Sequence, residues 1–431
     1  MKKSRKQSVN ISGKSAGYRI WLLSALLWIF SLGPAAARIV TGGISRVVVD
    51  EVEIQVEGGI IRSTSGHTIV VHMLSLSGRV MFSKLFITGH PLLPHDEKSR
   101  LSPISFPPGS PQTEAKALSP EPARQISDAD SYRRELLPGG LVEPLPEIEN
   151  FTLKLYNVNP LRVKIKGAKV IPPEPGQDSQ PPEAKVDLQV EFAANTRHEI
   201  KISSDYPNAS SFQFVVLGNS KKGIKTFKKI LKKTRKLRPL FFAHCGDLVA
   251  NGSGKQFQWS WALVNQVRFP FFITPGDDDV QNKGRQIFET WFGPSYYSFN
   301  FSDSHFVFVD NSSGNISQQQ FQWLINDLSE NQDKKIFVFT HMPPFDPRPN
   351  LSNRMYHAPN ARWFMDIMSH YKVRRVYASH LSGYFRQERQ GVTYIITGGG
   401  GAKLLKKLDY HHFLAVTVKG DKIVDRLIKI R

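Results

Sequence analysis

Short apolar runs alternate with helical segments between residues 212 and 378, and this rhythm limits the fold more than any other feature of the chain. The runs are typical of strands buried on both faces of a sheet, and the segments between them repeat apolar residues at helical spacing. Helices are predicted at 223–238, 256–267, 318–328 and 360–371, and strands at 212–217, 240–243, 271–274, 335–340 and 374–378. The pattern therefore predicts an α/β domain.

Polar clusters follow five of the predicted strands. They span residues 218–221, 246–249, 275–280, 340–344 and 379–382. Ligands of α/β folds bind beyond the carboxyl ends of the strands, and these clusters bring carboxylates and imidazoles to that edge. Three consecutive acids, Asp277 to Asp279, repel one another unless a cation or solvent is near. The sequence therefore predicts a divalent metal with oxygen and nitrogen ligands.

The order and local sequence of these clusters resemble the calcineurin-like metallophosphoesterases, particularly their secreted, purple-acid-phosphatase-like branch. The resemblance extends over about residues 212–418 and includes the segments 246–249, 341–347 and 398–402. It implies a four-layered α/β/β/α architecture over 209–431 and the hydrolysis of phosphate esters at a two-metal centre.

The chain departs from the family pattern at three blocks. Residues 219–221 read Asn-Ser-Lys where the family has Asp-x-His, and residues 276–279 read Gly-Asp-Asp-Asp where it has Gly-Asn-His-Asp/Glu. Residues 379–382 read Ser-His-Leu-Ser where the family has Gly-His-x-His. About half of the usual metal ligands are thus replaced.

When each replaced residue is assigned to one of the family's two metal sites, most of the replacements fall on one site. The resemblance implies that the ligands of the retained metal are Asp247, Asp277, His341 and His380. Two carboxylates and two imidazoles suit Mn, Fe or Zn. The residues at the other site are Asn219, Lys221, Asp247 and Ser382, which lack one carboxylate and both imidazoles. The expected cofactor is therefore a single divalent transition metal ion.

Three residues beside these ligands are candidate catalytic residues. Lys221 would place positive charge where the missing ion lies in the family, and would hold a phosphate oxygen, while Asn219 would help to orient the substrate. Asp278 stands where the family has a histidine that protonates the leaving group, and a carboxylic acid needs a raised pKa to do this. The alternatives are that Lys221 points to solvent and that Asp278 has no catalytic role.

The first half of the chain has a different pattern. A basic segment, an apolar run at 20–32 and three alanines at 35–37 predict an export signal over 1–37, and hence a periplasmic or extracellular protein. An uncleaved membrane anchor is the alternative, although the run is shorter than the ~20 residues of a spanning helix. Residues 38–205 alternate apolar and polar side chains, which predicts a β-rich, sandwich-like domain with a Pro-rich insertion at 102–147.

The formal net charge of +20 favours anionic partners. Residues 221–238 contain ten Lys or Arg and no acid. A solvated helix face is the simplest interpretation, and contact with a polyanion or an anionic membrane is the alternative. No motif for sequence-specific nucleic-acid recognition is present. Cys245 is the only cysteine, lies in an apolar run and is expected to be an inert buried thiol.

Three functions are compatible with these observations. The first is an exported metal-dependent phosphoesterase, acting on a phosphomonoester or phosphodiester with a single-metal centre. The second is a pseudoenzyme that binds a phosphorylated or polyanionic ligand without turnover. The third is an envelope scaffold protein whose basic helix and β-rich domain make the contacts.

Overall fold

The computed structural model describes residues 44–50, 52–84, 148–172, 184–193, 196–206, 210–405 and 410–431. The predicted export signal at 1–37 and the predicted Pro-rich insertion at 102–147 lie outside the described residues. Within the described ranges, no helix is both long enough and apolar enough to cross a bilayer.

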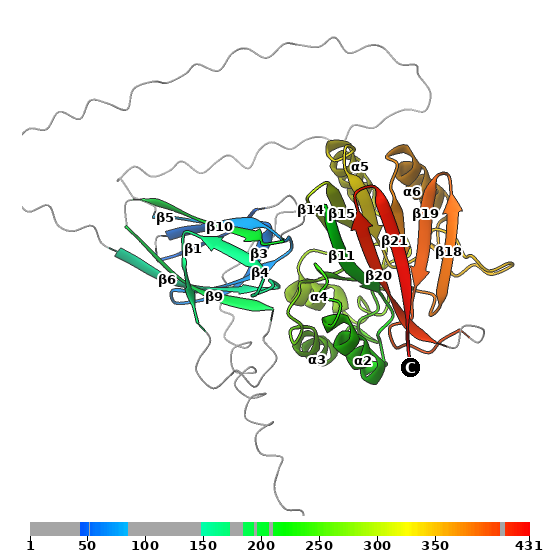
Figure 1. Ribbon diagram of the computed structural model, residues 1–431, viewed down its shortest axis with the longest axis horizontal. Coiled ribbons are helices and arrows are strands. Elements are labelled where there is room, and N and C mark those ends of the chain that lie inside the picture. The colour runs from blue at the N-terminus through cyan, green and yellow to red at the C-terminus, as the bar shows by residue number, and fades with distance from the viewer. Residues whose placement is uncertain are drawn as a thin grey trace, which may run out of the picture. The chain divides into compact units, whose positions relative to one another are not determined.

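The N-terminal described region consists of two five-stranded sheets (Figure 1). The strands of the first, in spatial order, are β1 (Ile44–Val49), β2 (Val52–Glu57), β5 (Gly78–Lys84), β10 (Arg197–Ser204) and β7 (Val163–Lys166). Those of the second are β3 (Gly59–Ser65), β4 (Thr68–Met73), β6 (Ile148–Tyr156), β9 (Lys185–Ala193) and β8 (Lys169–Ile171). Alternate side chains such as Ile54 and Leu188 are fully buried in one core that draws on both sheets. The predicted β-rich, sandwich-like region is confirmed.

The region from β11 onward contains two further sheets. The strands of one, in spatial order, are β13 (Phe271–Ile273), β12 (Phe242–His244), β11 (Ser211–Leu217), β20 (His411–Lys419) and β21 (Lys422–Ile430). Those of the other are β14 (Tyr297–Phe301), β15 (Ser304–Phe308), β16 (Lys335–Phe339), β17 (Arg375–Ala378), β19 (Val392–Thr397) and β18 (Tyr384–Arg389). β11, β12 and β13 run parallel, and so do β15, β16, β17 and β19. Their carboxyl ends therefore meet at one edge of each sheet.

Helices cover the outer faces of these two sheets. α2 (Ile224–Arg235), α3 (Gly254–Val264) and α4 (Gly284–Phe292) share an apolar cluster with β11 to β13, whereas α5 (Gln318–Glu330) and α6 (Ala358–His370) share one with β15 to β17. Figure 1 shows the first group in green and the second in yellow to brown. The α/β/β/α layering is confirmed.

A layer of aromatic rings separates the two sheets. The ring of Phe214 on β11 packs edge-on against Phe306 and Phe337 of the other sheet, with centroids 5.6 and 5.5 Å apart. Phe241 contacts Phe306 in the same way at 4.9 Å. All four side chains are fully buried. Rigid rings of this size fix the spacing of the sheets.

The sequence pattern missed α4 and the strands β14, β15 and β18 to β21, and it displaced one strand. The strand predicted at 240–243 forms at Phe242–His244, and no helix was predicted at Gly284–Phe292. α4 is nine residues long, and its buried Phe288 and Phe292 pack with Phe257 of α3. A helix so short depends on tertiary packing more than on its own periodicity.

Candidate metal centre

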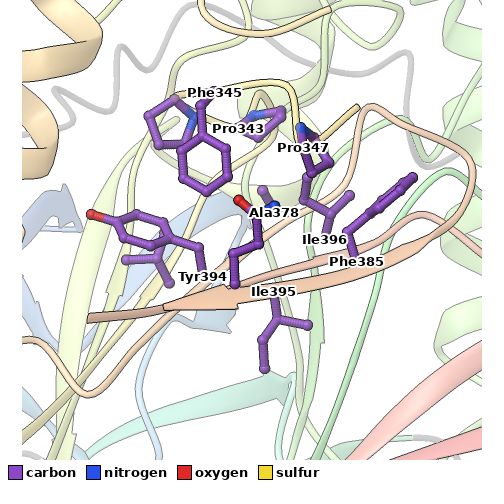
Figure 2. A pocket seen from close by; sticks show the side chains of 11 residues that line it. Pro343, Phe345, Pro347, Ala378, Phe385, Tyr394, Ile395 and Ile396 are labelled. Carbon is purple, nitrogen blue, oxygen red and sulfur yellow. The ribbon is translucent and has the colours of Figure 1, made fainter. Parts of the chain in front are cut away.

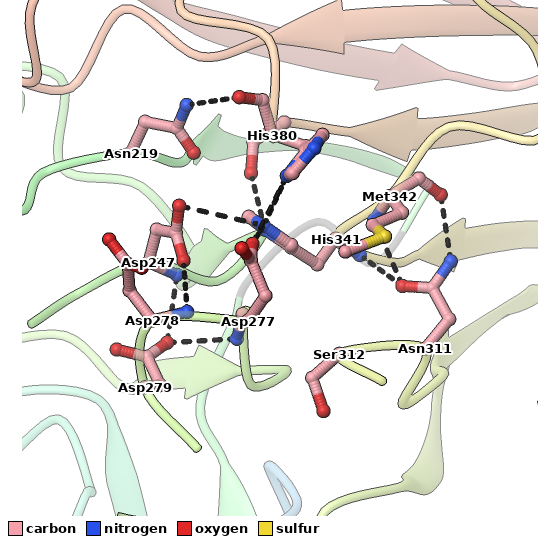
Figure 3. A network of polar contacts seen from close by, with 12 residues as sticks. Asn219, Asp247, Asp277, Asp278, Asp279, Asn311, Ser312, His341, Met342 and His380 are labelled. Carbon is pink, nitrogen blue, oxygen red and sulfur yellow. Dashed lines mark hydrogen bonds and ion pairs between the residues drawn. The ribbon is translucent and has the colours of Figure 1, made fainter. Parts of the chain in front are cut away.

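Four side chains from four strand-end loops converge at the edge of the two sheets (Figure 3). Asp247 and Asp277 follow β12 and β13, whereas His341 and His380 follow β16 and β17. One ligand atom of each residue lies within 4.8 Å of the others. His341 Nε2 is 2.7 Å from Asp277 Oδ1, 3.1 Å from His380 Nδ1 and 3.5 Å from Asp247 Oδ2. The structure thus brings together all four residues that the sequence proposed as metal ligands.

Hydrogen bonds from outside the cluster fix both imidazoles. His341 Nδ1 donates to the carbonyl oxygen of Cys245 at 2.8 Å, and His380 Nε2 donates to Asn353 Oδ1 at 2.9 Å. The other nitrogen of each ring faces the carboxylates, which is the orientation that metal-binding histidines require. With two carboxylates and two imidazoles so arranged, these residues fit a divalent transition metal ion.

The electrostatics of the cluster favour a cation. Burial alone would lower the pKa of His341, but Asp247 and the hydrogen bond with Asp277 raise it to about 9. Burial would raise the pKa of Asp277, but its hydrogen bonds with His341 and His380 hold it well below its usual range. The carboxylates therefore stabilise positive charge here, and a metal ion must displace the proton that His341 retains.

Asp279 is a structural residue and lies outside the ligand cluster. It is fully buried, and its carboxylate accepts hydrogen bonds from the N–H groups of Asp247 and Val249, each at 2.8 Å, and of Gly276 at 2.9 Å. Burial, together with the nearby charge of Asp247, raises the pKa of Asp279 to about 7. Of three consecutive acids, one thus faces the ligand cluster and another ties the loops after β12 and β13 together.

Lys221 lies between two carboxylates and does not extend into solvent. Its Nζ is 2.6 Å from Asp247 Oδ2 and 2.6 Å from Asp278 Oδ2, and its side chain is 23% exposed. Burial would lower the pKa of Lys221, but Asp247 and Asp278 hold it above its usual range. The ammonium group is therefore charged at neutral pH, next to an oxygen of a candidate metal ligand.

Asp278 is held in an ionic and hydrogen-bonded arrangement. Besides its ion pair with Lys221, it accepts a hydrogen bond from Gln281 Nε2 at 2.6 Å, and its own N–H donates to Asp247 Oδ1 at 3.1 Å. Lys221 and Gln281 thus occupy both carboxylate oxygens of Asp278, whereas a leaving-group acid must direct an O–H toward the substrate. The arrangement suits Asp278 to hold Lys221 better than to donate a proton.

Asn219 connects the loop after β11 to the loop that carries His380. Its Nδ2 donates to the carbonyl oxygen of His380 at 2.9 Å and to Ser382 Oγ at 3.1 Å. The residue is fully buried, and its Oδ1 has no hydrogen-bond partner among the described residues. An unpartnered buried oxygen is costly, so Oδ1 is a candidate acceptor for a ligand.

Asn311 and Cys245 support the centre through hydrogen bonds to His341 and its neighbour Met342. The sequence analysis did not propose either residue for this role. Asn311, which follows β15, accepts the N–H groups of His341 and Met342 at 3.1 and 2.9 Å and donates to the Met342 carbonyl at 2.7 Å. Cys245 contributes its carbonyl group, while burial raises the pKa of its thiol and keeps it protonated. Asn311 lies at a strand end like the ligands, so the same rule could have found it.

A separate pocket beside the loop after His341 is apolar. Pro343, Phe345, Phe385 and Tyr394 line it among others, and it carries no carboxylate or imidazole (Figure 2). Its volume of about 10 Å³ has room for about one water molecule. It is therefore not a site for a phosphate ester.

Comparison with known proteins identifies the domain. Residues 212–398 match the family model for calcineurin-like phosphoesterases. Over 119 residues the chain is 28% identical to a probable glycerophosphodiester phosphodiesterase GpdQ of Arcobacter nitrofigilis, a match that covers 25% of this chain and 44% of the relative. Over 199 residues it is 25% identical to purple acid phosphatase 13 of Arabidopsis thaliana, covering 38% of this chain and 35% of the relative.

Solved structures also match part of the chain. Purple acid phosphatase PPD1 from yellow lupin (Lupinus luteus) seeds has 14% sequence identity and a TM-score of 0.46, and the match covers 65% of this chain and 67% of that chain. The chain spans less than half the length of the two curated relatives. Residues 212–398 form a calcineurin-like phosphoesterase domain, as the strand-end motifs predicted.

Proposed function

We propose that this protein is a metal-dependent phosphoesterase that hydrolyses a phosphomonoester or phosphodiester at a centre with one metal ion. The observation that carries the proposal is the convergence of Asp247, Asp277, His341 and His380 within 4.8 Å, with both imidazoles oriented from behind. The family match and the phosphodiesterase and phosphatase relatives support the same substrate class.

The chain's own residues would bind and orient the substrate. A divalent ion held by Asp247, Asp277, His341 and His380 would supply Lewis acidity and a nucleophile derived from water. The ammonium group of Lys221 has three N–H donors, and among the described residues it pairs only with Asp247 and Asp278. Its third donor would hold a phosphoryl oxygen, so that fixed charge replaces part of what a second ion provides.

Metal analysis combined with a hydrolysis assay tests the proposal. Purified wild-type protein should contain about one Mn, Fe or Zn ion per chain and hydrolyse a nitrophenyl phosphomonoester or phosphodiester. His341→Ala should lose both the ion and the activity, whereas His370→Ala, an exposed histidine at the end of α6, should keep both. Activity that persists in His341→Ala and in metal-free protein would contradict the proposed centre.

A second candidate function is a binding module without turnover. It is favoured by the ion pair between Lys221 and Asp247, because the ammonium group occupies the carboxylate that a second metal ion would need as a ligand. Loss of half of a two-metal clamp removes stabilisation of either the attacking or the leaving oxygen. A protein that binds one ion and also vanadate or phosphate, yet hydrolyses neither ester, would support this function. A protein that binds no metal under metal-replete conditions would favour the scaffold function.

Export remains part of the proposal and rests on residues 1–37 alone. The basic segment, apolar run and small residues in this order support cleavage after about residue 37. Amino-terminal sequencing of the protein recovered from its source cells tests this directly. An intact amino terminus in membrane fractions would support the uncleaved anchor instead.

A further inference from the structure

A groove between α2 and α3 exposes two large apolar side chains. Ile224 on α2 and Trp259 on α3 are 43% and 53% exposed, and both line the same groove of about 180 Å³. Its lining also includes the buried side chains of Phe227, Leu248 and Leu263. The groove is therefore lined largely by apolar side chains, two of which are exposed to solvent.

Lysines beside this groove have no acidic partners. Lys225, Lys228 and Lys232 are exposed, and no carboxylate among the described residues forms an ion pair with them. Lys229 and Lys233 belong to the other flank of α2, since they reach the carbonyl oxygens of Arg431 and Lys429 at 3.4 and 2.9 Å. Lys228 lies one helical turn from Ile224, and Lys225 and Lys232 lie one turn on either side of Lys228, so these three lysines of α2 are available to an external anion.

We propose that this surface docks on an anionic lipid bilayer. We define the α2–α3 face as Ile224, Lys225, Lys228, Lys232 and Trp259. In this arrangement the lysines lie among lipid head groups, while Trp259 and Ile224 enter the interfacial region, where tryptophan is favoured. A polyanion such as heparin would use the same lysines but would leave the two apolar side chains without a role. The combination of charge with exposed apolar area thus fits a bilayer best.

The α2–α3 face borders the candidate metal centre. Ser220 and Lys222 line the groove and are the two neighbours in sequence of Lys221. Docking would bring the loop that carries Lys221 close to the head groups of the bilayer. The inference does not depend on hydrolysis, because binding to lipid is measured without turnover.

Vesicle sedimentation with the full chain tests the docking surface. The protein should bind phosphatidylcholine vesicles that contain phosphatidylserine and should bind phosphatidylcholine alone weakly. Replacing Lys225, Lys228 and Lys232 with Gln should weaken binding to the anionic vesicles by roughly 100-fold at low salt. Trp259→Ala should weaken it by roughly tenfold. Trp363→Ala removes a tryptophan of α6 that is 45% exposed, and should have no effect.

A charge-matched variant controls for net charge. Replacing Lys372, Lys419 and Lys422 with Gln removes three exposed lysines outside α2 and should leave vesicle binding unchanged. Unchanged melting temperatures would show that all variants are folded. The inference is overturned if the lysine variant of α2 binds vesicles like the wild type. It is also overturned if Trp259→Ala binds vesicles normally while the α2 lysine variant loses vesicles and heparin alike, which indicates a polyanion site.

Discussion

The two halves of the candidate metal centre carry different side chains, but the loops of both halves have an ordered backbone. In one half, Asp277, His341 and His380 join Asp247 as candidate ligands, and hydrogen bonds from the surrounding loops hold the two imidazoles. In the other half, Asn219 and Lys221 stand where the family pattern has a carboxylate and an imidazole. Polar and charged groups occupy both halves, but only one offers a complete ligand set.

The loop of the altered half is nevertheless firmly placed. Asn219 N–H donates to the Gly246 carbonyl and Lys221 N–H to the Asp247 carbonyl, each at 3.0 Å, and Ala402 N–H donates to the Asn219 carbonyl at 2.9 Å. These bonds involve backbone atoms, which a substitution of side chains leaves in place. The comparison therefore separates loop geometry, which is ordered in both halves, from ligand identity, which differs.

Restoring the ligands of the altered half should have the largest effect. Asn219→Asp, Lys221→His and Ser382→His together should create a second metal site beside Asp247, with a Kd on the order of 1 µM or below, about 8 kcal/mol of new binding free energy. The removal of the Lys221 cation also removes repulsion of the incoming ion. Elemental analysis should give two ions per chain, and the further change Asp278→His should raise phosphoesterase activity.

Lys221→His alone is the control for this restoration, because one imidazole does not make a site. It should leave the metal content at about one ion per chain. A folded quadruple variant that still binds one ion would show that the side chains project in directions unsuited to ligation, despite the ordered backbone.

Removing a ligand from the complete half should have the next largest effect. His380→Ala should lower metal affinity by roughly 1,000-fold, about 4 kcal/mol, since even the partners that orient a ligand are worth 10–100-fold. Titration with a chelator as competitor measures this affinity. Asn353→Ala, which removes only the hydrogen-bond partner of His380, should cost roughly tenfold or less at its exposed position. Equal losses in the two variants would indicate that His380 is not a ligand.

Asp279→Asn tests the bonds that hold the complete half together. The amide retains one acceptor but turns its NH₂ group toward backbone donors, which should lower the free energy of unfolding by about 3 kcal/mol. Urea denaturation measures the change, and Asp333→Asn, whose side chain is 75% exposed, is the matched control. A loss no greater than that of the control would contradict a structural role for Asp279.

Ser382→Ala should have the smallest effect. Ser382 accepts one hydrogen bond from Asn219, which also donates to the His380 carbonyl, so about 1 kcal/mol or less of stability is at stake. The metal content should stay at about one ion per chain. A fall in metal content would place Ser382 among the residues on which the ion depends, and the sorting of ligands would need revision.

The convergence of the four ligands was predictable because each follows a strand, and parallel strands bring their ends to one edge. The roles of Asp278 and Asp279 were not predictable in this way. Which of three adjacent acids points inward depends on the dihedral angles of one turn, and each of the last two acids also has a partner 30 residues away or more. Asp279 meets Val249, and Asp278 meets Lys221. The sequence identifies the turn but does not show which of its side chains faces the ligand cluster.

The α/β class of the fold followed from periodicity, whereas its α/β/β/α layering was implied by the family resemblance. Strands with apolar residues on both faces must be covered on both sides, and this requirement predicts the sheets and helices around β11 and β16. α4 was not predicted because a nine-residue helix has little more than two turns in which an apolar period can be recognised. Its position is fixed by the rings of Phe257 and Phe288, which a single chain segment does not reveal.

The aromatic layer between the two sheets has a consequence for how this centre can change over evolutionary time. Asp247 and Asp277 belong to one sheet and His341 and His380 to the other, so the thickness of the ring layer determines how far apart the two pairs of ligands lie. Metal ligands tolerate errors of only about 0.2 Å in bond length. A smaller side chain at Phe214 or Phe306, remote from any ligand, would thus alter the choice or retention of an ion. Substitutions in the aromatic core would then change the metal preference of the centre without replacing any ligand.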